Sequence, residues 1–170
     1  MAVRRHRIGD RRAWASFSPC GRWRYALVRT WGAGPRLLCV LLNPSTADAE
    51  ADDATLTRCC RRAGALGFGA LRMVNLFAWR ATRPAELSLA ADPVGPENDR
   101  ALRSGAAWAD AILCGWGVHG RLFERDRAVL RLLGRRPLWH LGLTVAGQPR
   151  HPLYVAAAQP MLPWSAGQGA

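Results

Sequence analysis

RLLCVLLNP, at residues 36–44, is an unbroken apolar run that stops at an Asn-Pro pair. A run of this kind, with no polar alternation, is typical of a strand buried on both faces, as in a parallel sheet. Further runs of the same form follow, and each ends in polar or aromatic residues: ALRMVNL at 70–76, DAILCGW at 110–116 and the shorter PLWHLG at 137–142. These four segments are predicted to be neighbouring buried strands.

Helical periodicity fills the gaps between these strands. Apolar side chains recur at i, i+3, i+4 and i+7 from Leu56 to Ala63, with Asp53 placed to cap the helix and Gly67 to stop it. Similar patterns predict helices over 97–109 and 121–133 and a short helix near 84–90, whereas the tail from 143 is predicted to be irregular.

The order of these elements predicts the fold class. Strands that alternate with helices form crossovers, and crossovers make a parallel sheet with helices on its faces. We therefore expect an α/β fold, a three-layer α/β/α sandwich with a mainly parallel four-stranded sheet. RWRYALVRT at 22–30 is predicted to be a strand of an N-terminal β extension. A chain of 170 residues suits a single domain, 1–170.

Composition excludes several classes of protein. With 49% apolar and 21% charged residues, the chain is globular in composition, and no apolar run is long enough to span a membrane. The basic N-terminus lacks the apolar stretch of a signal peptide, so we expect a cytoplasmic protein. The five cysteines form no CxxC pair and are predicted to be reduced, and we expect neither a metal site nor a cofactor.

The charge of +12 has two interpretations. It is the electrostatic signature of a protein that binds a polyanion such as nucleic acid. Alternatively, it reflects codon bias in a GC-rich genome, because every basic residue is Arg and none is Lys. The shortage of acidic residues is not explained by such a bias.

The loops after the four predicted strands carry most of the candidate chemistry. They read LNPSTAD, NLFAWRAT, GWGVHG and GLTVAGQPRHPLY. In an open α/β sheet, ligands bind beyond the carboxyl ends of the strands, where such loops converge. We therefore expect Asn43, Asn75, Trp116 and His151 to meet at one edge of the sheet.

These loops resemble known motifs. LNPSTAD at 42–48 is similar to the signature of a bacterial and phage family of unknown function. The loops also resemble, in order, four motifs of the uracil-DNA glycosylase superfamily: the Asn-Pro at Asn43, the segment VNLFAWR at 74–80, the Gly-Trp-Gly around Trp116 and the His-Pro at His151. The resemblance covers about residues 36–155 and implies a uracil-DNA glycosylase-like core there.

The resemblance implies roles for individual side chains. Asn43 would position an attacking water, which an amide can orient but not deprotonate. Asn75 would bind a base edge, and His151 would donate to a carbonyl oxygen of the leaving base. The other predicted substrate-binding residues are Pro44, Ser45, Phe77, Trp79, Arg80, Trp116, Arg150 and Tyr154, with Thr82 supporting their loop. The alternatives are a strand-ending turn at Asn43, main-chain contacts by Asn75 and core packing by Phe77 and Trp79.

Three acidic residues follow the first motif. Asp48, Asp52 and Asp53 could supply a base or bind a divalent metal. Acidic residues at a helix start also complement its dipole, and this interpretation is favoured for Asp52 and Asp53. Asp48 lies further from the helix and is the third predicted catalytic residue, with Asn43 and His151.

Three functions remain open at this stage. The first is a nucleic-acid-binding protein, with DNA favoured over RNA, that hydrolyses the N-glycosidic bond of a base or modified base in DNA repair or modification. The second is a non-catalytic nucleic-acid-binding module. The third is a small-nucleotide hydrolase or transferase that uses the acidic cluster.

Overall fold

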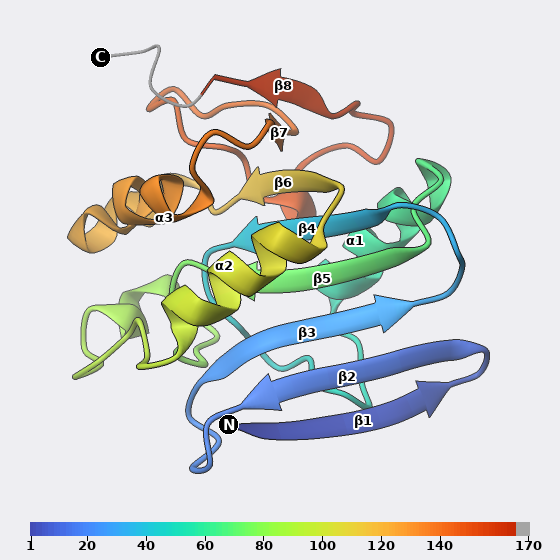
Figure 1. The fold of residues 1–170 in the computed structure, drawn as a ribbon. Helices are drawn as coiled ribbons and strands as arrows, with labels where there is room; N and C mark the ends of the chain where they lie inside the picture. The colour runs from blue at the N-terminus through green and yellow to red at the C-terminus, as the bar shows by residue number, and fades with distance from the viewer. Residues whose placement is uncertain (166–170) are drawn as a thin grey trace.

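An eight-stranded mixed sheet forms the centre of the computed structural model, which describes residues 1–165. Figure 1 shows the sheet from its β8 edge at the top to its β1 edge at the bottom. Its strands follow the spatial order β1-β2-β3-β5-β4-β6-β7-β8. Their bounds are β1 Ala2–Ile8, β2 Arg11–Phe17, β3 Arg24–Thr30, β4 Arg36–Leu41, β5 Ala70–Asn75, β6 Ala111–Gly115, β7 Leu138–His140 and β8 Leu162–Trp164.

The predicted sandwich on a mainly parallel four-stranded sheet, resembling uracil-DNA glycosylases, is wrong. Among residues 1–165, β4 pairs in parallel with β5 and β6, and β6 with β7. The other four pairings are antiparallel: β1 with β2, β2 with β3, β3 with β5, and β7 with β8. β1 is exposed from Ala2 to Arg7, and β2 begins with two exposed arginines and alternates at its centre, so neither strand carries a continuous apolar run.

The additional strands extend both edges of the sheet. Gly9 and Asp10 form the two-residue turn between β1 and β2, with Gly9 at φ +57°, a conformation that favours glycine. At the other edge, Leu162–Trp164 pairs with β7 although the tail was predicted to be irregular. Pro163 is tolerated there because β8 is an edge strand.

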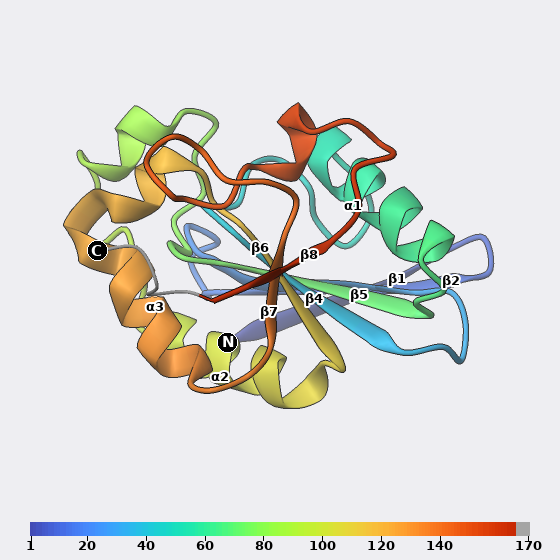
Figure 2. The same cartoon turned by 90° about the horizontal axis from the view of Figure 1, so that it is seen from above.

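Helices cover both faces of the sheet, with α1 on one face and α2 and α3 on the other (Figure 2). The bounds of α1 Ala54–Ala65 and α2 Asn98–Trp108 agree with the predicted helices. The helix predicted over 121–133 is shorter, because α3 is Arg125–Leu133 and a 3-10 segment precedes it. The short helix predicted near 84–90 is the 3-10 turn η1, Pro84–Leu87. Asp53 caps α1 as predicted, because its Oδ1 accepts a 2.8 Å hydrogen bond from the Leu56 amide. No helix within residues 1–165 has both the length and the apolar character needed to cross a bilayer.

The register of the parallel strands brings their following loops together. Leu41 at the end of β4 is paired with Asn75 on one side and Gly115 on the other. The chain therefore leaves β4, β5 and β6 at the same level of the sheet. Two further 3-10 segments, η2 Val118–Glu124 and η3 Pro152–Tyr154, lie in the loops that follow β6 and β7.

Candidate functional site

A pocket of about 530 Å³ lies beyond the ends of β4 and β6, beside the start of α1. Its volume is in the range of small-molecule sites. Of the predicted site residues, the structure brings six to its lining, which are Asn43, Ser45, Trp116, Arg150, His151 and Tyr154, together with the supporting Thr82.

Asn43 lines the pocket with its amide held in one orientation. Its Nδ2 donates to the carbonyl oxygen of Ala81 at 2.7 Å and to that of Pro44 at 3.1 Å. Only the NH₂ side of an amide can face two carbonyl oxygens, so the contacts fix which side is which. Within the described part of the chain the Oδ1 accepts no hydrogen bond, and it remains available as an acceptor.

His151 begins the η3 turn, and its hydrogen bonding determines its tautomer. Its Nδ1 accepts a 3.3 Å hydrogen bond from the Leu153 amide. Burial lowers the pKa of His151, and the negative charge of Asp53 opposes this only in part. The ring is therefore neutral near pH 7, with its proton on Nε2, and His151 is a donor at the nitrogen not bound to Leu153.

Tyr154 provides an exposed aromatic ring at the pocket. Its ring centre lies 5.7 Å from that of His151, tilted by 49°, and the residue is 81% exposed. Arg150 is also exposed and donates from Nε to the carbonyl of Leu143. A flat ring and a guanidinium group are thus both open to solvent beside His151.

Trp116 forms part of the pocket wall, and a hydrogen bond to Gln148 holds its indole ring in place. It is buried, and its Nε1 donates a 2.6 Å hydrogen bond to Oε1 of Gln148, whose Nε2 donates at 3.0 Å to Asp126. Gly120 is pressed against the indole ring, where no side chain would fit. Trp116 therefore shapes the pocket, and its polar atom is already engaged.

Sequence inspection missed several polar residues of the lining. His119 and Thr144 lie in loops that were singled out, but neither was assigned a role. Arg24 gave a weaker signal, since it lies within the predicted strand 22–30 rather than after a strand. It is buried, and burial lowers the pKa of its guanidinium to about 10, with the charges of Asp53 and Asp48 acting in the opposite direction.

Five predicted binding residues lie outside the pocket lining, and they are Pro44, Asn75, Phe77, Trp79 and Arg80. Asn75 is buried and is the last residue of β5. Its Nδ2 has no partner among residues 1–165, and its main-chain carbonyl accepts a hydrogen bond from the Asn98 side chain. Phe77 is fully buried in the core that faces α2 and α3. The structure therefore gives Phe77 the packing role that was its alternative.

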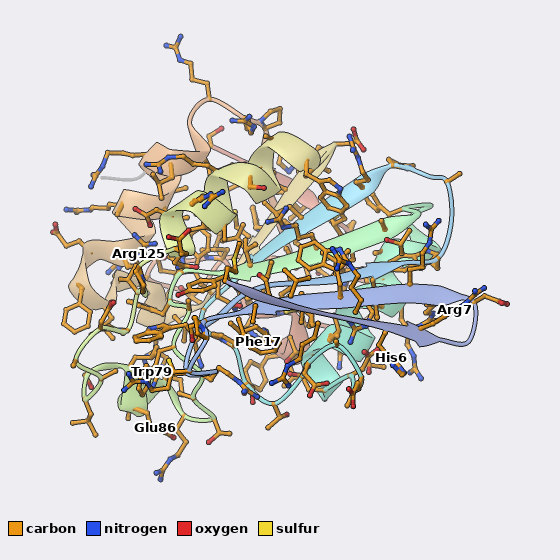
Figure 3. All side chains as sticks on the ribbon, turned by 60° about the horizontal axis from the view of Figure 1, so that its bottom comes forward. His6, Arg7, Phe17, Trp79, Glu86 and Arg125 are labelled. Carbon is orange, nitrogen blue, oxygen red and sulfur yellow. The ribbon has the colours of Figure 1, made fainter. Side chains whose placement is uncertain are left out.

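Trp79 and Arg80 make aromatic and cation–π contacts with different partners, outside the pocket lining. Trp79 packs edge-on against Trp23 at 5.6 Å, and the Arg22 guanidinium lies over both rings. Arg80 is exposed and lies over the ring of Phe17 at 5.4 Å. Figure 3 shows Trp79 far from Arg7, which lies in β1 near the turn between β1 and β2.

Pro44 is buried next to the pocket and does not line it. Its carbonyl oxygen accepts hydrogen bonds from the Asn43 side chain and from the amide of Ala81. The Asn-Pro pair therefore joins the loop after β4 to the loop after β5.

The three acidic residues of the first loop have separate functions. Burial alone would raise the pKa of Asp48, but hydrogen bonds from the amides of Ala51 and Glu50 give a net lowering. Asp52 forms a 2.7 Å ion pair with the buried Arg29. Asp53 caps α1 and alone of the three lines the pocket.

The different partners of these three carboxylates are relevant to the alternative function, a small-nucleotide hydrolase or transferase that would use the acidic residues to bind a metal. Among residues 1–165, no three His, Cys, Asp or Glu side chains come together in a way that could hold a metal ion. The three carboxylates thus have different partners, which are two main-chain amides for Asp48, an arginine for Asp52 and the start of a helix for Asp53.

Comparisons with known proteins assign the family. A family of proteins of unknown function, DUF1643, matches residues 24–153, which include β3, the LNPSTAD segment and most of the pocket. No curated protein and no solved structure matches the chain. Nothing in these comparisons indicates a relationship to the uracil-DNA glycosylases. The match to DUF1643 spans more than half of the sequence, and the chain belongs to that family.

Proposed function

We propose that the pocket binds one nucleotide unit of a nucleic acid, with DNA as the favoured polymer. The observation that carries the proposal is the pairing of Asn43 and His151 in one pocket. Asn43 presents an acceptor because its Nδ2 is engaged, and His151 presents a donor because its Nδ1 is engaged. Nucleobase edges combine donors and acceptors in this way.

Two further features support binding of a base with its backbone. Tyr154 offers an open ring for stacking, an interaction worth about 1–3 kcal/mol per base. Arg150 lies beside it and suits a phosphate. The exposed arginines of β1 and β2 add a more distant, sequence-independent attraction for a polyanion, and these are Arg4, Arg5, Arg7, Arg11 and Arg12.

The same groups define the reaction to test, which is hydrolysis of an N-glycosidic bond. Asn43 would orient the water through Oδ1, and the His151 donor would stabilise charge that develops on the leaving base. Asn43 cannot take the proton of that water. Asp53, the carboxylate in the pocket lining, would accept that proton. Asp48 is engaged by two amides outside the pocket, so the proposal gives Asp48 no catalytic role.

The proposal separates into binding and catalysis, which need different assays. Binding is measured by fluorescence anisotropy with labelled single-stranded and duplex oligonucleotides at several salt concentrations. Asn43→Ala and His151→Ala are each expected to weaken binding about tenfold, which corresponds to ~1.4 kcal/mol. His6→Ala, at an exposed position of β1, is the matched control and should leave the affinity unchanged.

Catalysis is measured on the same oligonucleotides carrying uracil, hypoxanthine or modified pyrimidines. Abasic sites are revealed by strand cleavage after alkali. Cleavage that Asn43→Ala abolishes supports the hydrolase. Salt-dependent binding with no cleavage of any substrate leaves the non-catalytic binding module. An absence of binding to every oligonucleotide overturns the proposal.

A further inference from the structure

Arg24, at the start of β3, is a buried cation that lies in the lining of the pocket. The residue is only 2% exposed and yet belongs to the pocket lining. A guanidinium group carries five N–H donors and a permanent charge, so burying it is costly unless it is paired.

The contacts of Arg24 leave most of this capacity unused. Its Nη1 donates a 2.6 Å hydrogen bond to the carbonyl of Ala47. Its Nη2 makes only a weak 4.0 Å contact with the sulfur of Met73. Within residues 1–165 Arg24 forms no salt bridge, and Asp53 and Asp48 act on it only at longer range.

Arg29 on the same strand shows what a satisfied buried arginine looks like. It is fully buried, and its Nε and Nη2 both donate to Oδ1 of Asp52, at 2.9 Å and 2.7 Å. It also donates to the carbonyls of Val28 and Asp48. Arg29 does not line the pocket. Of these two arginines, the one without a carboxylate partner is thus the one that belongs to the pocket lining.

We infer that Arg24 is an anion subsite of the pocket and that the bound nucleotide carries a terminal phosphate. This inference rests on the proposed function and specifies its substrate class. A guanidinium binds phosphate through paired, charge-assisted hydrogen bonds. An internal phosphodiester must continue the chain on both sides, whereas a 2% exposed group is reached only by a group that enters end-on. A phosphate monoester, on a strand end or a free mononucleotide, meets this requirement.

The local charge balance agrees with binding of an anionic group. Arg24 and Arg150 contribute two positive charges to the lining, and Asp53 contributes one negative charge. Asp53 already accepts the Leu56 amide through Oδ1, so its charge is partly compensated by the start of α1. An added anion would meet one excess positive charge.

The test compares ends of the same oligonucleotide. Wild-type protein is titrated with single strands that carry a 5′-phosphate, a 3′-phosphate or only hydroxyl ends, and in parallel with inorganic phosphate, a nucleoside and its 5′-monophosphate. We expect one phosphorylated end to bind about tenfold more tightly than the hydroxyl-ended strand. Preference for the monophosphate alone would assign the free mononucleotide as the source of the phosphate.

Variants assign the preference to Arg24. Arg24→Met removes the charge and keeps the apolar stem, and it should abolish the discrimination between phosphorylated and hydroxyl ends. Arg24→Lys keeps a cation without the fork and should retain part of it. Arg103→Met, at an exposed position of α2, is the control and should behave as wild type.

The outcomes distinguish this inference from the proposed function. If strands bind with equal affinity whatever their ends, or if folded Arg24→Met and Arg24→Lys retain the full preference, the subsite is overturned and nucleic-acid binding stands. If no strand binds but the monophosphate binds in an Arg24-dependent way, the subsite stands and the nucleic-acid proposal fails. The wild-type comparison does not depend on how stable the variants are.

Discussion

The side chain of Asn43 donates a 2.7 Å hydrogen bond to the main-chain carbonyl of Ala81 and so joins the loops that leave β4 and β5. Asn43→Ala leaves the carbonyls of Ala81 and Pro44 without this donor and should lower the free energy of unfolding by about 1–2 kcal/mol. Asn43→Asp should cost more at neutral pH, because a carboxylate offers two carbonyl oxygens no proton. Urea denaturation measures both.

Ser45→Ala, in the same loop, is the control for Asn43. The Ser45 side chain makes no hydrogen bond within the described residues, so the unfolding midpoint of Ser45→Ala should match that of wild type. An Asn43→Asp protein as stable as wild type would contradict the amide orientation on which the site depends.

Asp53 has two roles that substitution can separate. Asp53→Ala removes the acceptor of the Leu56 amide and should destabilise the protein by about 1 kcal/mol. Asn is as good a helix cap as Asp, so Asp53→Asn should keep most of the stability while removing the negative charge from the pocket. Thermal unfolding compares the two, and equal losses in both variants would show that charge rather than capping dominates.

Gly120 and Gly64 form a matched pair of glycine substitutions. A Cβ at Gly120 would overlap the indole of Trp116, so Gly120→Ala should cost about 1–3 kcal/mol. Gly64 lies in α1 with open space around the added carbon, and Gly64→Ala should gain about 0.5–1 kcal/mol. Chemical denaturation should move the two midpoints in opposite directions; a tolerated Gly120→Ala would contradict the tight Trp116 wall.

Mild acidification should destabilise the protein through two histidines. Burial lowers the pKa of His140 and His151 below the ordinary value of 6.5, so the unfolded chain takes up protons first as the pH falls. Their contribution is complete above pH 6.5 and is lost below it. Asp48 and Asp110 have pKa values lowered from 3.8, and their contribution is lost only in more acidic solution.

Unfolding midpoints between pH 7.5 and 5 test this assignment. The wild-type midpoint should fall across this interval, and the double variant His140→Gln/His151→Gln should show a flatter profile. An unchanged slope in the double variant would assign the loss to other groups.

The sequence predicted the central strands because burial on both faces leaves continuous apolar runs. The β4 and β6 segments were identified in this way, whereas the strands at the edges were not. In β2, buried Ala13 and Ala15 alternate with more exposed Arg12 and Trp14, so the segment resembled a basic arm. Pairing partners depend on contacts distant in sequence, and the periodicity of single segments carries no information about them.

The site was predicted in part for a similar reason. Asn43 follows Leu41 by two residues and therefore lies beyond the sheet edge, whereas Asn75 is itself paired with Leu41 and remains inside the sheet. The sequence shows both as the end of an apolar run, and only the register separates them. Arg24 was missed because its position within a strand does not reveal that its side chain lines a pocket.

A titration followed by ¹H–¹⁵N correlation spectra tests nucleotide binding in the pocket most directly. The probe is a 5′-phosphorylated single-stranded oligonucleotide, added to wild-type protein and to Asn43→Ala. The account predicts the largest shifts at the amides of Gly117 and Leu153 and at the Trp116 indole, which all belong to the pocket lining. Shifts confined to the basic hairpin of β1 and β2, or identical shifts in Asn43→Ala, would contradict it.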